Sequence, residues 1–186
     1  MQKLYPTNNF VSLQRPHPSA RDLNRLVIAE APGERESKEG QPLVGDAGRE
    51  FNALLEKARI PRNGLTIINC LNCQPPKNVF PTDSKARKYI TKEQAQIAVA
   101  HCIKHHVDPV IRKRTWARVD LLGGKSLRFV ANIKGRMSKL RGRRVEIQRA
   151  GLKPLIGIPV YHPSYLMRWG QSKRPVTVKD LKSDVG

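Results

Sequence analysis

Three polar side chains lie where apolar stretches of this sequence end. Glu30 interrupts the end of the run 26–31, Asn69 lies near the end of the run 65–71, and His162 follows the run 155–161 directly. A carboxylate can orient water or stabilise a cationic sugar, an amide can read the edge of a pyrimidine, and an imidazole can stabilise a departing base. Each residue also has a structural explanation, because Glu30 can cap or pair, Asn69 can complete a strand end, and a lone histidine is commonly hydrogen-bonded for structure.

The elements that must position these residues alternate between strand and helix. Apolar and β-branched runs predict strands over 26–31, 65–71, 119–122 and 155–161, and helical spacing predicts helices over 47–59 and 91–107 and another after 123. This alternation predicts an α/β fold, a three-layer αβα single domain with a central, mostly parallel four-stranded sheet. Because parallel strands present their carboxyl ends at one edge, we expect the three polar residues to line one cleft.

The remaining segments predict loops and an arm. Residues 1–25 are polar and carry prolines without a sustained period, so we expect an irregular N-terminal arm before a domain at 26–186. Residues 74–81 are too rich in proline for regular structure. The sequence at 123–126 is Gly-Gly-Lys-Ser, which resembles the end of a phosphate-binding loop. That motif requires a glycine at position 119, where this chain has valine, so the motif is absent. The start of the helix after 123 could still contact one phosphate through its N–H groups.

The composition limits which classes of partner and which cellular location this protein is expected to have. Lys and Arg number 35 against 15 Asp and Glu, a formal net charge of +20, which attracts a polyanion such as nucleic acid although it can also serve solubility alone. No stretch approaches about 18 apolar residues and no signal peptide opens the chain, so we expect no membrane insertion. Three cysteines indicate a reducing, intracellular location rather than a disulfide framework. We expect a monomer.

Several motifs resemble those of the uracil-DNA glycosylase superfamily, and most closely its family four, the iron–sulfur type. They run in the family's order from about residue 26 to Leu181, and they are Ala29-Glu30-Ala31-Pro32-Gly33-Glu34-Arg35-Glu36, Gly40-Gln41-Pro42-Leu43-Val44-Gly45-Asp46-Ala47-Gly48, Asn69 four residues before Cys73-Gln74-Pro75-Pro76-Lys77-Asn78, Arg141-Gly142, and His162-Pro163-Ser164-Tyr165-Leu166-Met167-Arg168.

The resemblance implies a monofunctional hydrolase of base excision repair. Such an enzyme flips uracil out of single- or double-stranded DNA and hydrolyses its N-glycosidic bond, leaving an abasic site. On this interpretation Glu30 and His162 are catalytic, since Glu30 matches the acid that positions water and His162 matches the residue that binds the departing uracil. The implied substrate-binding residues are Asn69, Ala31, Pro32, Gly33, Leu43 and Glu36.

The resemblance also implies contacts to the DNA backbone and stack. The implied DNA-binding residues are Lys125, Ser126, Arg141, Pro163, Ser164, Tyr165, Leu166, Met167 and Arg168. Either Leu166 or Met167 would insert into the space that the flipped nucleotide leaves. The stretch 132–149, with seven Lys and Arg against Glu146 alone, would add phosphate contacts that carry no sequence information.

The sequence departs from the family pattern in three ways. Leu43 stands where family four has an aromatic residue that stacks on the flipped base, and alanine replaces a usual glycine at 29. Cys73 and Cys102 match two of the four cluster ligands, but residues 1–25 hold no cysteine, and an extended 65–72 would put Cys70 about 10 Å from Cys73. Histidines 17, 101, 105 and 106 are conceivable substitute ligands for a cluster or for zinc. We expect chemistry without a cofactor or metal, and the incomplete ligand set argues against an iron–sulfur cluster.

Three classes of function fit these observations. An active DNA glycosylase explains the charge and all three strand-end residues together. A superfamily member that is catalytically weak or inactive and only binds DNA or uracil-containing DNA would also explain Leu43 and the missing cysteines. An RNA-binding or assembly protein explains the charge alone, so the sequence favours the glycosylase.

Overall fold

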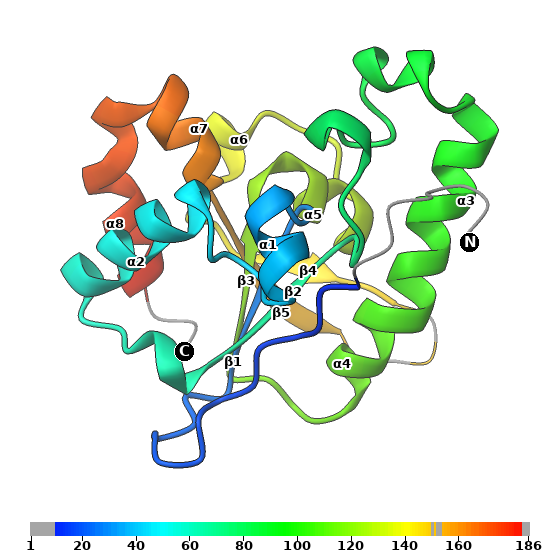
Figure 1. The fold of residues 1–186 in the computed structure, drawn as a ribbon. Helices are drawn as coiled ribbons and strands as arrows, with labels where there is room; N and C mark the ends of the chain where they lie inside the picture. The colour runs from blue at the N-terminus through cyan, green and yellow to red at the C-terminus, as the bar shows by residue number, and fades with distance from the viewer. Residues whose placement is uncertain (1–9, 150, 152–153, 184–186) are drawn as a thin grey trace.

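The computed structural model describes residues 10–149, 151 and 154–183, and its centre is one five-stranded sheet (Figure 1). The strand order is β2 (Leu65–Asn69), β1 (Arg25–Ala29), β3 (Arg118–Leu122), β5 (Leu155–Val160) and β4 (Val145–Ile147). The first four strands are parallel to their neighbours, whereas β4 is antiparallel to β5. The predicted α/β fold with a mostly parallel sheet is therefore confirmed.

Helices cover both faces of this sheet. They are α1 (Glu34–Glu39), α2 (Asp46–Ala58), α3 (Lys92–Cys102), α4 (Asp108–Arg112), α5 (Gly123–Val130), α6 (Met137–Leu140), α7 (Pro163–Arg168) and α8 (Arg174–Lys182). A π-helical turn at Ile103–Val107 joins α3 to α4. Thr91 caps α3 because its hydroxyl accepts from the Gln94 N–H, while the Gln94 side chain accepts from the Thr91 N–H. None of the helices in the described ranges has the length and apolar character needed to cross a membrane.

The sequence-based count of four strands was wrong, because β4 is a fifth. This strand has only three residues, and its middle residue Glu146 is exposed. Two inward-facing apolar residues, Val145 and Ile147, inside a strongly basic stretch are too short a pattern for period-two alternation to identify. The helix α1 was also missed, since its six residues hold no apolar stripe.

The described part of the N-terminal arm lies along the outer edge of β2. Gln14 and Ile67 exchange backbone hydrogen bonds of 2.9 and 3.0 Å, and Phe10 forms a second antiparallel bridge with Cys73. These contacts cover an edge strand that would otherwise expose unpaired backbone groups. The first nine residues of the predicted arm lie outside the described residues.

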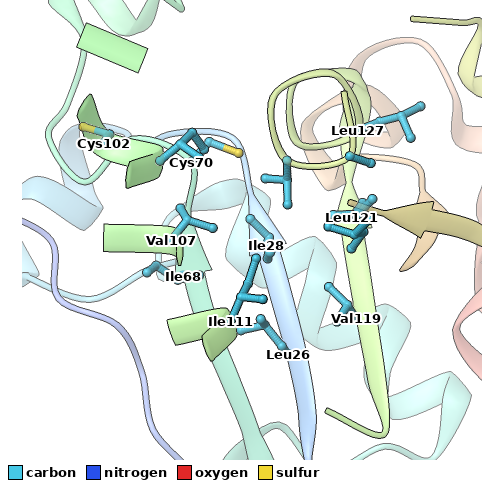
Figure 2. Close-up of a cluster of buried hydrophobic side chains, with 14 of the residues drawn as sticks. Leu26, Ile28, Ile68, Cys70, Cys102, Val107, Ile111, Val119, Leu121 and Leu127 are labelled. Carbon is cyan, nitrogen blue, oxygen red and sulfur yellow. The ribbon is translucent and has the colours of Figure 1, made fainter. Parts of the chain in front are cut away.

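The core has two apolar layers, one on each face of the sheet. Along β1, Leu26 and Ile28 belong to one layer and Val27 and Ala29 to the other, as alternation along a strand requires. Figure 2 shows the first layer, where β1, β2 and β3 pack against the α3–α4 segment and α5. The second layer lies under α2, α7 and α8. Burial on both faces explains why β1 is apolar without interruption.

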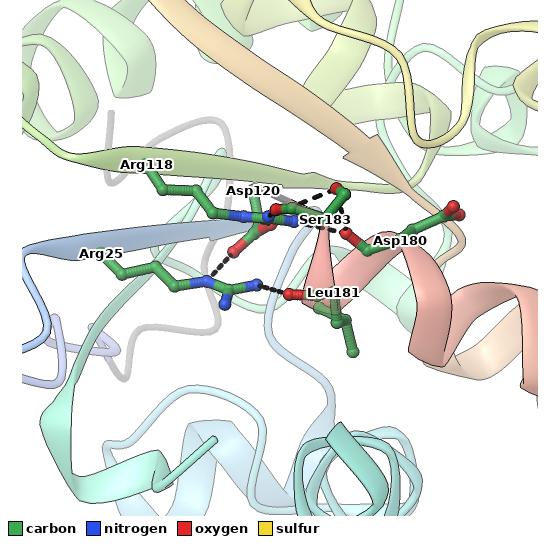
Figure 3. A network of polar contacts seen from close by, with 6 residues as sticks. All are labelled: Arg25, Arg118, Asp120, Asp180, Leu181 and Ser183. Atoms are coloured by element: carbon green, nitrogen blue, oxygen red, sulfur yellow. Dashed lines mark hydrogen bonds and ion pairs between the residues drawn. The ribbon is translucent and has the colours of Figure 1, made fainter. Parts of the chain in front are cut away.

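A buried cluster of charges fastens α8 to the amino-terminal ends of the strands (Figure 3). The fully buried Asp120 carboxylate on β3 accepts from Arg25 Nε at 2.5 Å and from Arg118 Nε at 2.9 Å. The two guanidinium groups then donate to backbone oxygens, Arg25 to Leu181 at 3.1 Å and Arg118 to Asp180 at 2.6 Å. One carboxylate therefore allows two buried cations to hold the end of α8.

We expect Asp120→Asn to destabilise the fold strongly, because it leaves two buried guanidinium groups without an anion. Breaking a buried ion pair by removing one partner costs about 3–5 kcal/mol. Urea unfolding measures this loss, and Glu39→Gln, which removes an exposed i,i+4 pair with Arg35, should leave the midpoint unchanged. Equal midpoints for Asp120→Asn and the unsubstituted protein would contradict the role given to this cluster.

Candidate functional site

The three strand-end residues line one cavity of about 660 Å³. Glu30 directly follows β1, and Asn69 is the last residue of β2. His162 lies two residues after the end of β5, from which Tyr161 separates it. Because β2, β1, β3 and β5 are parallel, these positions meet at the carboxyl edge of the sheet. The predicted convergence of the three residues is therefore observed.

The Glu30 carboxylate lies at the N-terminus of α5. Its Oε1 accepts a hydrogen bond of 3.3 Å from the Lys125 N–H, and the partial positive charge of the helix end stabilises a carboxylate there. Gly123 has φ +89°, and a Cβ at this position would collide with Glu30 Oε1 and stand 3.0 Å from His162 Cβ. The Gly-Gly-Lys segment therefore holds Glu30 beside His162.

The ring orientation of His162 follows from its own backbone environment. Nδ1 accepts from the Ser164 N–H at 3.2 Å and lies 2.7 Å from Ser164 Oγ, so the His162 side chain caps the start of α7. Because Nδ1 presents a lone pair to that N–H, the proton of a neutral ring resides on Nε2. His162 can therefore donate a hydrogen bond from Nε2.

Asn69 supplies an amide from the neighbouring strand. The residue is 3% exposed, and none of the hydrogen bonds between described residues uses its side chain. Its backbone is fixed in register with Ala29, and the following N–H of Cys70 donates to Ala29 O at 2.9 Å. The amide is therefore rigidly placed and free to bind a planar polar group in the cavity.

Glu36, which the resemblance assigns to substrate binding, ties two loops together. Its Oε1 accepts from the N–H groups of Val44 at 3.1 Å and Gly45 at 2.8 Å, and its Oε2 accepts from Gly33 at 3.1 Å. The side chain lines the cavity wall but is only 7% exposed, and both carboxylate oxygens are engaged. Glu36 therefore positions the cavity rather than offering it a charge.

Leu43 is held in a left-handed backbone conformation with φ +53°. Arg62 donates to the carbonyl of Leu43 at 2.9 Å and to that of Pro42 at 2.8 Å, while its Nε donates to Gln14 Oε1 at 3.1 Å. Burial lowers the pKa of the Arg62 guanidinium. The leucine side chain is 5% exposed and packs in the second apolar layer, so it forms part of the cavity wall.

The loop that closes the cavity holds residues that the sequence did not single out. Phe80 and Asp83 line it, and the Phe80 ring stacks on Phe129 at 5.6 Å with Lys125 Nζ 5.0 Å from its centroid. Both residues follow the proline-rich stretch 74–78, where no periodic pattern exists to indicate burial. The predicted cavity residues Ala31, Pro32 and Gly33 also lie in the wall.

Three of the predicted DNA-contact residues already have partners within the protein. Lys125 forms an ion pair with Asp83, and Arg141 pairs with Asp180, its Nε 2.5 Å from Oδ2. Ser126 is fully buried and donates to Gly123 O at 2.9 Å. The structure thus gives all three a role in holding the fold around the site.

The predicted DNA-binding residues on α7 differ in how exposed their side chains are. Ser164 and Arg168 line the cavity, Tyr165 is 39% exposed, Met167 is half-buried, and Pro163 is buried at the start of the helix. Leu166 has no exposed surface and packs in the second apolar layer. The helix turns Leu166 toward α2 and the sheet. In this conformation its side chain is not exposed and is not available for the predicted insertion into a base stack.

The cysteines do not fit a four-thiolate cluster. Only three occur in the sequence, and burial together with the nearby Glu30 raises the pKa of the fully buried Cys70 well above its usual range. Burial also raises the pKa of the Cys73 and Cys102 thiols. Within the described ranges, no three His, Cys, Asp or Glu side chains are placed to share a metal ion. The His106 ring instead contacts Phe10, with centroids 5.0 Å apart.

Comparisons with known proteins relate the chain to one family. The family model described as "Uracil DNA glycosylase superfamily" matches residues 16–185. A type-4 uracil-DNA glycosylase of Thermotoga maritima is 31% identical over 163 residues, which cover 87% of this chain and 76% of the relative. A type-4 uracil-DNA glycosylase of Archaeoglobus fulgidus is 27% identical over 166 residues, 86% of this chain and 72% of the relative.

We expect Glu36→Gln to loosen the loops around the cavity. The amide can keep one acceptor toward Val44 and Gly45, but its NH2 group then faces the Gly33 N–H, leaving a donor unpaired at a cost of about 1–3 kcal/mol. Amide hydrogen exchange at Gly33, Val44 and Gly45 should accelerate. In Glu34→Gln, which alters an exposed neighbour paired with Lys38, exchange at these amides should not change. Unchanged exchange in Glu36→Gln would refute the positioning role.

Proposed function

The chain belongs to the uracil-DNA glycosylase superfamily, and we propose that it hydrolyses the N-glycosidic bond of uracil in DNA to leave an abasic site. The observation that carries this proposal is the meeting of Glu30, Asn69 and His162 around one cavity. A carboxylate, an amide and an imidazole in one pocket supply the three interactions that this hydrolysis requires.

The proposed chemistry assigns one task to each side chain. As the bond between C1′ of the sugar and N1 of uracil breaks, its electron pair leaves with the base, and Nε2–H of His162 donates to the oxyanion that develops on uracil. The Glu30 carboxylate stabilises the cationic sugar and orients the water that attacks C1′. As the C1′–O bond forms, Glu30 accepts the proton that the water loses, and this proton neutralises the uracil anion when the products leave. Asn69 binds the edge of the flipped base through its donor and acceptor.

The surroundings of the cavity support a nucleic-acid substrate. The net charge of +20 attracts the phosphate backbone, and Ser164 and Arg168 sit at the cavity on the same helix that His162 caps. Enzymes that act on a base within a duplex extrude the nucleotide from the stack, and the cavity would receive the uridine in this extruded form. An aliphatic Leu43 lines the pocket where family four has an aromatic ring, which weakens stacking on the base by an amount on the order of 1–3 kcal/mol.

We expect the protein to convert a labelled duplex with one uracil into an alkali-sensitive product. Glu30→Gln should lower the single-turnover rate roughly 10²- to 10⁴-fold, and His162→Ala roughly 10²- to 10³-fold. Glu56→Gln, on the exposed face of α2, is the matched carboxylate control and should react at the unsubstituted rate. Denaturing gel electrophoresis after alkali treatment measures the cleaved fraction.

The same assay separates the glycosylase from a protein that only binds. Tight binding of uracil-containing DNA with no alkali-sensitive product would contradict the proposed hydrolysis and favour a binding protein. Cleavage that persists unchanged in both Glu30→Gln and His162→Ala would contradict the assignment of these residues.

We further propose that this chain folds and acts without an iron–sulfur cluster or zinc, because three cysteines cannot supply four thiolates and, among the described residues, no three His, Cys, Asp or Glu side chains are placed to share a metal ion. We expect less than stoichiometric iron and zinc in the purified protein by elemental analysis. Incubation with a chelator should change neither the thermal midpoint nor the excision rate, and the half-buried Cys73→Ser variant should behave like the unsubstituted protein. One metal equivalent per chain whose removal lowers the midpoint would refute this proposal.

A further inference from the structure

The end of α7 carries the most exposed of the large apolar side chains in the described part of the chain. Trp169 is 80% exposed, whereas the second tryptophan, Trp116, is 7% exposed. Tryptophan normally buries most of its surface, and exposed indole rings are enriched where proteins bind partners. The position of Trp169 therefore needs a physical explanation.

Trp169 has a fixed backbone position next to a residue that lines the cavity. It directly follows Arg168, which lines the cavity, and it lies one turn beyond Tyr165. The N–H groups of Trp169 and Gly170 both donate to the Tyr165 carbonyl, at 2.9 and 3.0 Å. The indole is therefore presented from an ordered turn between α7 and the segment that leads to α8.

The other large side chains of α7 are already packed. Leu166 has no exposed surface, and the Tyr165 ring stacks on Tyr161 with centroids 5.1 Å apart. Gly170 packs so closely on the Tyr165 ring that a Cβ at 170 would stand 2.8 Å from Cδ1. Among the described residues, none of the ring–ring or cation–π contacts involves Trp169. Trp169 alone on this helix end offers free ring faces.

The charge around Trp169 indicates what covers it. Arg168 precedes it in the chain and Lys173 follows it by four residues, both are exposed, and neither takes part in an ion pair between described residues. An exposed aromatic ring with two such cations nearby in the chain matches a nucleic-acid strand, in which phosphates alternate with flat bases. An apolar protein partner would leave both cations without an anion.

We propose that Trp169 stacks on an unstacked nucleobase of the DNA strand beside the extruded uridine, in the role that the buried Leu166 cannot fill. The inference rests on the proposed function in that DNA is the ligand. The base belongs either to a single strand or to a duplex interrupted at the flipped position. Arg168 and Lys173 then hold the phosphates on either side.

Tryptophan fluorescence tests this contact directly. Oligothymidine, a duplex with one abasic analogue, and inorganic polyphosphate are titrated against the intact protein. We expect both DNA ligands to quench the emission of Trp169, and polyphosphate, which has charge but no bases, to bind without quenching. In Trp169→Phe the remaining emission comes from the buried Trp116 and should not respond to DNA. A response with only one DNA ligand identifies whether the base belongs to a single strand or to an interrupted duplex.

Affinity at several salt concentrations provides the second measurement. Trp169→Ala should weaken oligothymidine binding on the order of tenfold with an unchanged salt dependence, because the lost contact is a stack. Trp169→Phe should retain most of the affinity. Arg168→Gln should reduce the slope of log K against log salt by about one. Trp169→Ala should keep the unsubstituted thermal midpoint, since its indole is not packed.

Two results would overturn the inference: equal quenching by polyphosphate and DNA, or an unchanged DNA affinity in Trp169→Ala. Neither result depends on excision, because the titrated ligands contain no uracil. A protein that quenches on DNA but never produces abasic sites would contradict the proposed hydrolysis and leave the stacking contact intact. A protein that excises uracil but whose Trp169 emission does not change with DNA would contradict the stacking contact and leave the proposed hydrolysis intact.

Discussion

Parallel pairing of four strands is the constraint on which this structure depends. Glu30 and Asn69 are 39 residues apart in the chain and His162 is a further 93 residues away, yet each follows or ends a strand of the same sheet. Since β2, β1, β3 and β5 run in one direction, their ends meet at one edge, and polar groups need only follow each apolar run to share a cavity. The opposite edge has a different task, because there Asp120 and two arginines fasten α8 under the sheet.

Carboxylates hold the cavity together through backbone N–H groups. Glu36 accepts from three such groups in two loops, and Glu30 accepts from one at the start of α5. Backbone donors of this kind fix a carboxylate in place without a paired cation. The glycines at 33, 45 and 123 leave the space that these approaches need, because a Cβ would crowd the carboxylates. The chain has 35 lysine and arginine residues, yet neither Glu30 nor Glu36 takes part in an ion pair between described residues.

Charge in this chain serves both the fold and the surface. Arg25, Arg118, Arg141 and Arg149 are held in ion pairs with buried acids, so they stabilise packing. The exposed Arg168 and Lys173 take part in none of the ion pairs between described residues, and they lie within four residues of the exposed Trp169 in the chain. A net charge read from composition does not separate these two groups, because pairing depends on neighbours that are distant in the chain.

The sequence by itself determined four of the five strands, the helices that begin near residues 46, 92 and 123, the capped start of α3 and the three polar strand ends, because apolar periodicity and local capping are encoded within a few residues. It did not reveal β4, whose three residues are too few for a pattern, or the inward orientation of Leu166, which depends on how α7 packs on α2 and the sheet. The motif resemblance located Glu36 at the cavity, but only the tertiary structure showed that its carboxylate accepts hydrogen bonds from the backbone of two loops. Such roles follow from contacts between segments remote in the chain, and no local pattern records them.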